Sequence, residues 1–209
     1  MTKMTETARA LGMTAILSVF ISQYAGASLP SRWTVDMDHS NGSVEFRATG
    51  HPSSLKIVGK GSAPKGSLLV ADTQVKGSLL FDLTSLDTGI EMRTHHMKEK
   101  YLETGKFHDA KLTITRMTLS QSLATEHFNL DSVPFAGKLS LHGVERPVSG
   151  TAKIEKNGKN VSFTAQFGLK ISDYRIAVPS FAGMTVADDV QVSVTDSAPL
   201  LVSASSKMH

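Results

Sequence analysis

The sequence contains no cysteine, and neither sign of charge is in large excess. Without cysteine there is no disulfide, no thiolate nucleophile, no iron–sulfur cluster and no cysteine-ligated zinc. The 22 Lys and Arg residues are interspersed with 19 Asp and Glu residues, whereas nucleic-acid-binding proteins cluster basic residues with stacking aromatic side chains. Together with a hydrophobic content of 40%, this predicts a globular protein without a nucleic-acid partner.

The sequence also lacks common catalytic motifs, including G-x-S-x-G, H-E-x-x-H and G-x-G-x-x-G. His95 and His96 are the best metal candidates, but neighbours on a helix point roughly 100° apart and cannot both face one ion. We therefore expect no catalytic residue and no metal ligand. His39, His108 and His142 lie beside expected strand ends, where they would either ring the mouth of a barrel or serve as ordinary turn residues.

Residues 1–27 have the pattern of a secretory signal peptide. Lys3 and Arg9 precede an apolar run over residues 10–21, and Ala25 and Ala27 are small residues before a cleavage point. The run is shorter than the roughly 20 apolar residues of a membrane span, which favours a cleaved signal over an anchor. We expect cleavage after Ala27 and a periplasmic or secreted protein.

Apolar and polar residues alternate in several later segments. Between residues 161 and 171 every odd position is apolar, while the even positions carry Ser, Thr, Gln, Gly and Lys. The same period of two recurs at 43–48, 135–141, 148–154 and 190–194, and less regular apolar runs lie at 55–58, 68–70, 77–83 and 112–119. This period is that of a strand with one buried face. With turn signals such as Asn157-Gly158 between segments, about nine antiparallel strands are expected.

Residues 88–104 break this pattern. Thr88 followed by Glu91 has the form of a capping box, and Met97 and Tyr101 continue an apolar face at helical spacing. We expect one short helix there, with Thr88 as its N-cap.

One helix cannot cover both faces of a large sheet, and each expected strand has only one apolar face. The sheet must therefore close into a barrel or form a two-sheet sandwich. We place this all-β domain at residues 28–196 and expect the serine-rich tail at 197–209 to be disordered. A barrel of this kind is either filled by its own side chains or hollow enough for a ligand.

Four segments of the chain are distinctive. They are DMDHSNGSVEF at 36–46, LDTGIEMRTHHM at 86–97, LSLHGVERPV at 139–148, and SDY at 172–174 together with DV at 189–190. In this order they resemble motifs of the YceI-like family of secreted bacterial polyisoprenoid-binding proteins, over about residues 33–196. The chain departs from the family pattern at Arg175, where a glycine is usual, and at His108-Asp109, where the family has Tyr-Pro.

The resemblance implies an extended, eight-stranded, lipocalin-like antiparallel β-barrel, with the helix near one opening. A long apolar tunnel would hold an isoprenoid quinone or related lipid, with no other cofactor. Arg175 would meet a polar head group or lie on the rim. The ligand-binding residues would be Phe46, Phe81, Leu83, Met92, Met97, Phe135, Leu139, Leu141, Phe163, Ala165, Phe167, Leu169, Arg175, Val192 and Val194.

The function expected from this resemblance is non-covalent: an extracytoplasmic carrier that takes a long-chain lipid as its partner. The expectation leaves room for transient membrane contact and for a homodimer. Two alternatives remain at this point. A filled barrel would act as an interaction protein through its outer surface, and an enzyme would use the mouth histidines on a lipid head group.

Overall fold

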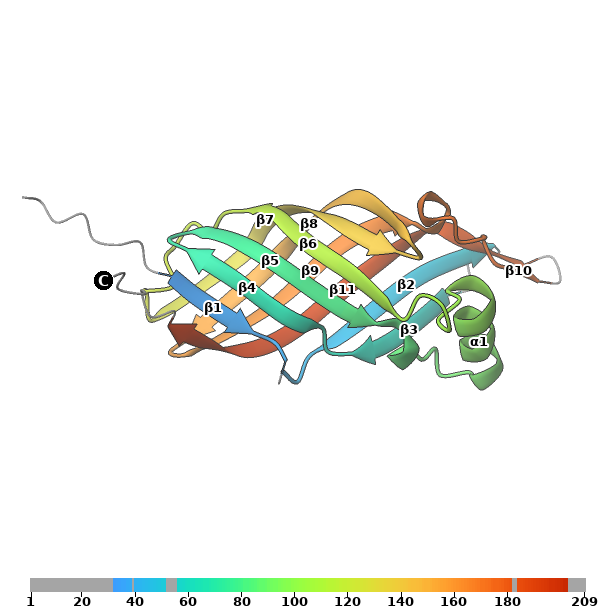
Figure 1. The fold of residues 1–209 in the computed structure, drawn as a ribbon, viewed down its shortest axis with the longest axis horizontal. Coiled ribbons are helices and arrows are strands. Elements are labelled where there is room, and N and C mark those ends of the chain that lie inside the picture. The colour runs from blue at the N-terminus through green and yellow to red at the C-terminus, as the bar shows by residue number, and fades with distance from the viewer. Residues whose placement is uncertain (1–31, 39, 52–55, 182–183, 203–209) are drawn as a thin grey trace, which may run out of the picture.

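A computed structural model describes residues 32–38, 40–51, 56–181 and 184–202 (Figure 1). The expected signal peptide and the last residues of the expected tail lie outside these ranges. No helix in the described part of the chain is long and apolar enough to cross a bilayer.

The described chain consists mainly of strands. They are β1 (Arg32–Asp36), β2 (Ser43–His51), β3 (Lys56–Ser62), β4 (Lys65–Ala71), β5 (Gln74–Asp82), β6 (Asp109–Met117), β7 (His127–Leu141), β8 (Val144–Asn157), β9 (Asn160–Lys170), β10 (Ser180–Phe181) and β11 (Met184–Val202). The helix α1 (Glu91–His96) continues directly into the π-helical segment η2 (Met97–Tyr101), and two short 3-10 turns are η1 (Leu83–Ser85) and η3 (Ile171–Tyr174).

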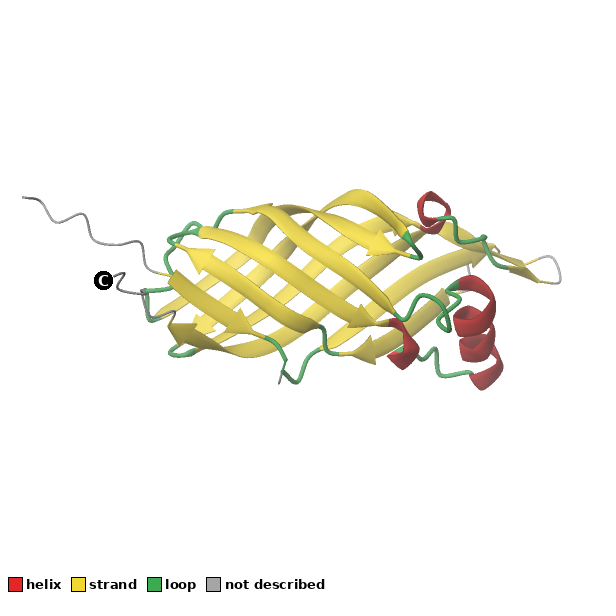
Figure 2. Ribbon diagram, viewed as in Figure 1, coloured by secondary structure: helices red, strands yellow, loops and turns green. Residues whose placement is uncertain are grey.

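The strands close into a barrel in which all pairings are antiparallel. A ring of eight strands runs β1-β4-β5-β6-β7-β8-β9-β11 and returns to β1, because β1 pairs with both β4 and β11. The long strand β11 pairs with β2 over its earlier half and with β1 only at its end, from Leu200 to Val202. Figure 2 shows the helices gathered at one end of this barrel. The expected all-β barrel with a short helix is confirmed, and the sandwich is excluded.

The alternating segments behave as their period predicts. On β7 the side chains of Val133, Phe135, Leu139 and Leu141 are buried, and on β9 Phe167 is buried between exposed neighbours. One face of each strand thus builds a common interior core.

The helix begins later than the capping box predicted. Its N-cap is Ile90, which makes no side-chain capping bond, so the expected role of Thr88 as N-cap is wrong. The Asp87 carboxylate instead accepts bonds from Gly89 N at 2.8 Å and from Thr94 Oγ1 at 2.9 Å. Gly89 adopts φ +75°, which only glycine adopts without cost. This turn delays the helix, whose α and π segments together span residues 91–101 rather than 88–104.

The last strand runs past the expected domain boundary at residue 196. Ala198 and Leu200 are buried and pair with Val161 on β9 and Val35 on β1, respectively. Residues 197–202 were expected to belong to a disordered tail, but their alternating apolar side chains complete the barrel. The small residues in this segment concealed that alternation.

The corner between β1 and β2 is held by a buried carboxyl group. Asp196 is 2% exposed, and Ser40 Oγ lies 2.7 Å from its Oδ2 and 2.9 Å from the carbonyl oxygen of Met37. One hydroxyl proton cannot serve both acceptors, whereas a protonated Asp196 would donate to Ser40 and free the hydroxyl for Met37. Burial also raises the pKa of this carboxyl, and the Ser40 hydrogen bond opposes that shift. Burial therefore makes this carboxyl a weaker acid in the folded protein than in the unfolded chain.

Candidate functional site

The barrel is hollow at its helix end. A cavity of about 510 Å³ lies there, within the range of about 300–1,000 Å³ typical of small-molecule sites. Its wall is almost entirely apolar and includes residues of β2, β3, β5, β7, β9 and β11 as well as α1 and η2. Ile90 and Met92, which line it, are 54% and 71% exposed. The cavity therefore reaches the surface beside the helix.

The position of the cavity follows from the strand pairing. At the helix end, β2 and β3 replace β1 in the barrel wall, and in the described chain β3 pairs as a strand only with β2. One isolated bridge, between Lys60 and Asp87, ties β3 to the segment before the helix. The helix lies beside β3 at this end of the barrel (Figure 1). Side chains of the helix rather than of a further strand thus form the wall there.

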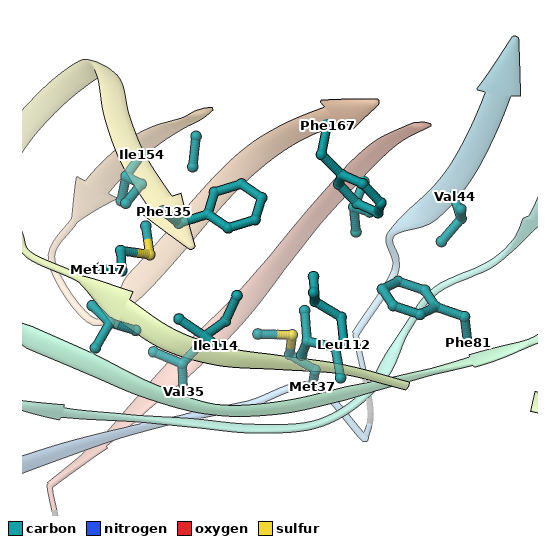
Figure 3. Packing of buried hydrophobic residues seen from close by; sticks show 14 of the residues in the cluster. Val35, Met37, Val44, Phe81, Leu112, Ile114, Met117, Phe135, Ile154 and Phe167 are labelled. Atoms are coloured by element: carbon teal, nitrogen blue, oxygen red, sulfur yellow. The ribbon is translucent and has the colours of Figure 1, made fainter. Parts of the chain in front are cut away.

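The other half of the barrel is filled. Only about 60 Å³ of space remains among the side chains that include Phe135, Phe163 and Ala165. The rings of Phe135 and Phe167 meet edge to face with centroids 6.3 Å apart. Figure 3 shows Met117 and Ile154 beyond Phe135 on the filled side. Since Phe167 lines the large cavity and Phe135 the small one, Phe167 forms the floor of the large cavity and Phe135 packs behind it. The two spaces are thus separate, where a continuous tunnel was expected.

The structure divides the predicted ligand-binding residues between these two spaces. Those on the wall of the large cavity are Phe46, Phe81, Leu83, Met92, Met97, Leu139, Leu141, Phe167, Leu169 and Val192. Those around the small one are Phe135, Phe163, Ala165 and Val194. Arg175 lines neither: it ends η3 with φ +60° and is exposed. A role in ligand binding remains a prediction for the first group.

Several wall residues were not among the predicted ones. They are Val44, Ala48, Ile57, Gly61, Ser62, Asp82, Ser85, Leu86, Thr88, Ile90, Arg93, His96, Tyr101, Leu102, Ala110, Ile171, Ile176, Pro179, Ser180, Val186 and Val190. The same period of two that marked Phe46 also marks Val44 and Ala48, so these two were accessible to sequence reasoning.

Two charged residues, Asp82 and Arg93, lie on the wall. The carboxylate of Asp82 accepts hydrogen bonds from Thr84, whereas the guanidinium of Arg93 is less fully bonded. Its Nη2 donates to the carbonyl oxygen of Thr88 at 2.6 Å, and its Nε is buried without a hydrogen-bond partner among the described residues. No carboxylate of the described chain forms a salt bridge with it. His96 follows three residues later and lines the same cavity, as i and i+3 positions of a helix share a face.

His108 and His142, the two described members of the expected ring of histidines, do not lie together at the mouth. The ring of His142 lies 3.1 Å from the carbonyl oxygen of Tyr174 and 2.7 Å from Glu103 Oε2, which ties the β7–β8 turn to the segment after η2. His108 is exposed and off the cavity wall, and His39 lies outside the described residues. Within the described ranges, no group of three potential metal ligands comes together.

Comparisons with known proteins agree with this geometry. The profile of the YceI-like domain matches residues 33–198. A UPF0312 protein of Yersinia enterocolitica is 24% identical over 176 residues, which cover 79% of this chain and 85% of that protein.

Two solved structures share the fold. BcnA of Burkholderia cenocepacia has a TM-score of 0.62 at 16% identity, covering 75% of this chain and 96% of its own. A polyisoprenoid-binding domain from Saccharophagus degradans, implicated in plant cell wall breakdown, has a TM-score of 0.60 at 16% identity, covering 80% and 97%. With the profile matching most of the chain, this protein belongs to the YceI-like family.

Proposed function

We propose that this protein binds a long-chain isoprenoid lipid, a quinone or its precursor, in the large cavity and carries it outside the cytoplasm without covalent chemistry. The observation that carries the proposal is an apolar cavity of about 510 Å³ that reaches the surface beside the helix. The description of the Saccharophagus domain as polyisoprenoid-binding supports the same class of ligand.

The energetics of burial support a carrier that needs no covalent anchor. Each buried CH₂ contributes about 0.8 kcal/mol, so an isoprene unit contributes roughly 3 to 4 kcal/mol. Association costs an estimated 4 to 15 kcal/mol. Three or four buried units therefore give useful affinity from the apolar wall alone.

The direct test is to purify the protein from its native compartment and identify co-purifying lipid by native mass spectrometry and lipid extraction. A bound isoprenoid supports the proposal. Protein that carries none, and whose melting temperature does not rise with added farnesol, contradicts it, because a ligand that binds the folded state must stabilise it. N-terminal sequencing of the same material tests export, which predicts a mature chain beginning at Ser28.

A matched pair of variants localises the site. Ala110 on β6 is buried on the wall of the large cavity, and its neighbour Lys111 is exposed on the outer face. Ala110→Trp should occupy the cavity and reduce lipid content severalfold, while Lys111→Trp should leave it unchanged. Equal lipid content in the two folded variants would contradict binding in this cavity. Ala165 is unsuitable for this test because it lies in the filled half, where a larger side chain would overpack the core at a cost of roughly 1 to 3 kcal/mol.

The enzyme alternative makes a different prediction at His96, the one described histidine on the cavity wall. In a carrier, His96→Ala leaves lipid bound in the cavity and abolishes no reaction. Turnover of a lipid by the wild type that is lost in this variant would contradict the carrier.

A further inference from the structure

We infer that Arg93 is a specificity residue which selects a lipid whose head group carries an oxyanion, a phosphate or a carboxylate, over an uncharged one. The inference rests on the proposed function, since it concerns the head of the same ligand. The apolar wall by itself does not distinguish a lipid with an anionic head group from one with an uncharged head group, and Arg93 would supply that distinction.

The first argument is the position of the charge. Arg93 borders the cavity within the turn of helix whose neighbours Ile90 and Met92 reach the surface. The apolar chain of a ligand would fill the deep part of the cavity, toward Phe167, and its polar head would remain near this mouth. His96, on the same helix face, adds an imidazole whose ring nitrogens can donate or accept a hydrogen bond there.

The second argument is that the guanidinium is incompletely satisfied. It has five N–H donors, and within the described chain its side chain makes one hydrogen bond, to the Thr88 carbonyl oxygen. The Nε–H is withdrawn from solvent without a partner, and an unpaired buried donor is costly. A small rotation of the side chain toward an oxyanion would supply both the missing acceptor and a counter-charge, and charge-assisted bonds of this kind are about twice as strong as neutral ones.

The third argument is that two carboxylates of this region, Asp82 on the cavity wall and Asp87 before the helix, are already engaged. Asp82 accepts bonds from the backbone N and hydroxyl of Thr84, and Asp87 accepts from Gly89 N and Thr94. These bonds lower the pKa of both carboxyls, and each carboxylate is held by residues of its own turn. The charge of Arg93 is left without a direct partner in the described chain.

The test compares ligands that share one chain and differ only in the head. Farnesyl phosphate, farnesoic acid and farnesol are titrated into the wild-type protein by calorimetry. Farnesyl phosphate should bind at least about tenfold more tightly than farnesol, as a hydrogen bond to a charged group implies. Farnesoic acid separates the two oxyanions: affinity equal to that of the phosphate assigns the site to oxyanions in general, and weaker binding assigns it to phosphate.

Variants then assign the preference to the residue. Arg93→Gln should bring the ratio of the farnesyl phosphate and farnesol affinities close to one. Arg93→Lys, which keeps the charge, should retain most of the ratio, so the inference remains testable if the glutamine variant folds poorly. Arg175→Gln is the control, because Arg175 lies off the cavity wall.

Three results would overturn the inference: equal affinities in the wild type, a ratio that survives Arg93→Gln, or its loss in a folded Arg93→Lys variant. Failure of all three ligands to bind would instead contradict the proposed function. The two failures are therefore distinguishable.

Discussion

Phe167→Ala should remove the floor of the cavity. The Phe167 side chain is 4% exposed and contacts Phe135 edge to face across the boundary between the hollow and filled halves. Buried Phe→Ala changes cost about 3 to 5 kcal/mol. Because one side of this ring already faces open space, we expect a value near the lower end, about 3 kcal/mol.

Two measurements follow from this change. With a urea m-value of about 1 to 3 kcal/mol/M, the unfolding midpoint should fall by about 1 to 3 M. The cavity should also deepen toward the small space behind Phe135. In a series of geraniol, farnesol and geranylgeraniol, the variant should therefore gain affinity for the longest chain relative to the wild type.

Phe135→Ala is the matched control, since Phe135 is equally buried but lies on the filled side of the boundary. It should lose a similar amount of stability and keep the wild-type preference for chain length. If Phe167→Ala shows the same chain-length preference as the wild type, Phe167 is not the floor. A loss of less than about 1 kcal/mol would refute the packing argument itself.

Two further predictions concern polar contacts. Thr94→Val removes the hydroxyl that donates to Asp87 and accepts from Thr88 N. Local opening of the helix should therefore become easier and its amide hydrogens should exchange faster; unchanged hydrogen exchange in the helix would contradict this. The pKa of Asp196 is raised above 3.8 by burial, so the folded state binds this proton more tightly than the unfolded chain. Proton binding therefore stabilises the fold at low pH, and this stabilisation is lost as pH rises through the folded pKa. The Asp196→Asn variant cannot lose this proton, so its stability relative to the wild type should increase as pH rises through the folded pKa. Parallel pH–stability curves of the two proteins would contradict this.

Periodicity in the sequence predicted which face of each strand is buried, but not how far along the barrel each residue lies. Phe167 and Ala165 share one face of β9, yet they line different spaces. Depth along the axis depends on strand register and tilt, which follow from pairings between segments far apart in the chain. The division of the interior was for that reason not predictable from a single strand.

The helix shows a second limit of local patterns. Its apolar spacing predicted its existence, while the stronger hydrogen bonds around Asp87 decided its start. Arg93 and His96 were visible in the sequence but not recognisable as wall residues, because a helix has several faces and tertiary packing selects the one that meets the cavity. Of the two places expected for Arg175, beside a head group or on the rim, its exposed position at the end of η3 fits the second.

The contact between Phe135 and Phe167 separates two parts of the barrel in which substitutions have different consequences. Side chains of the filled half are constrained by packing, where a change of one methylene group is costly. Wall residues of the hollow half face space on one side, so many replacements there change the shape of the cavity without loss of the fold. In such a barrel, substitutions confined to the helix end can reshape the cavity while the filled half preserves the fold.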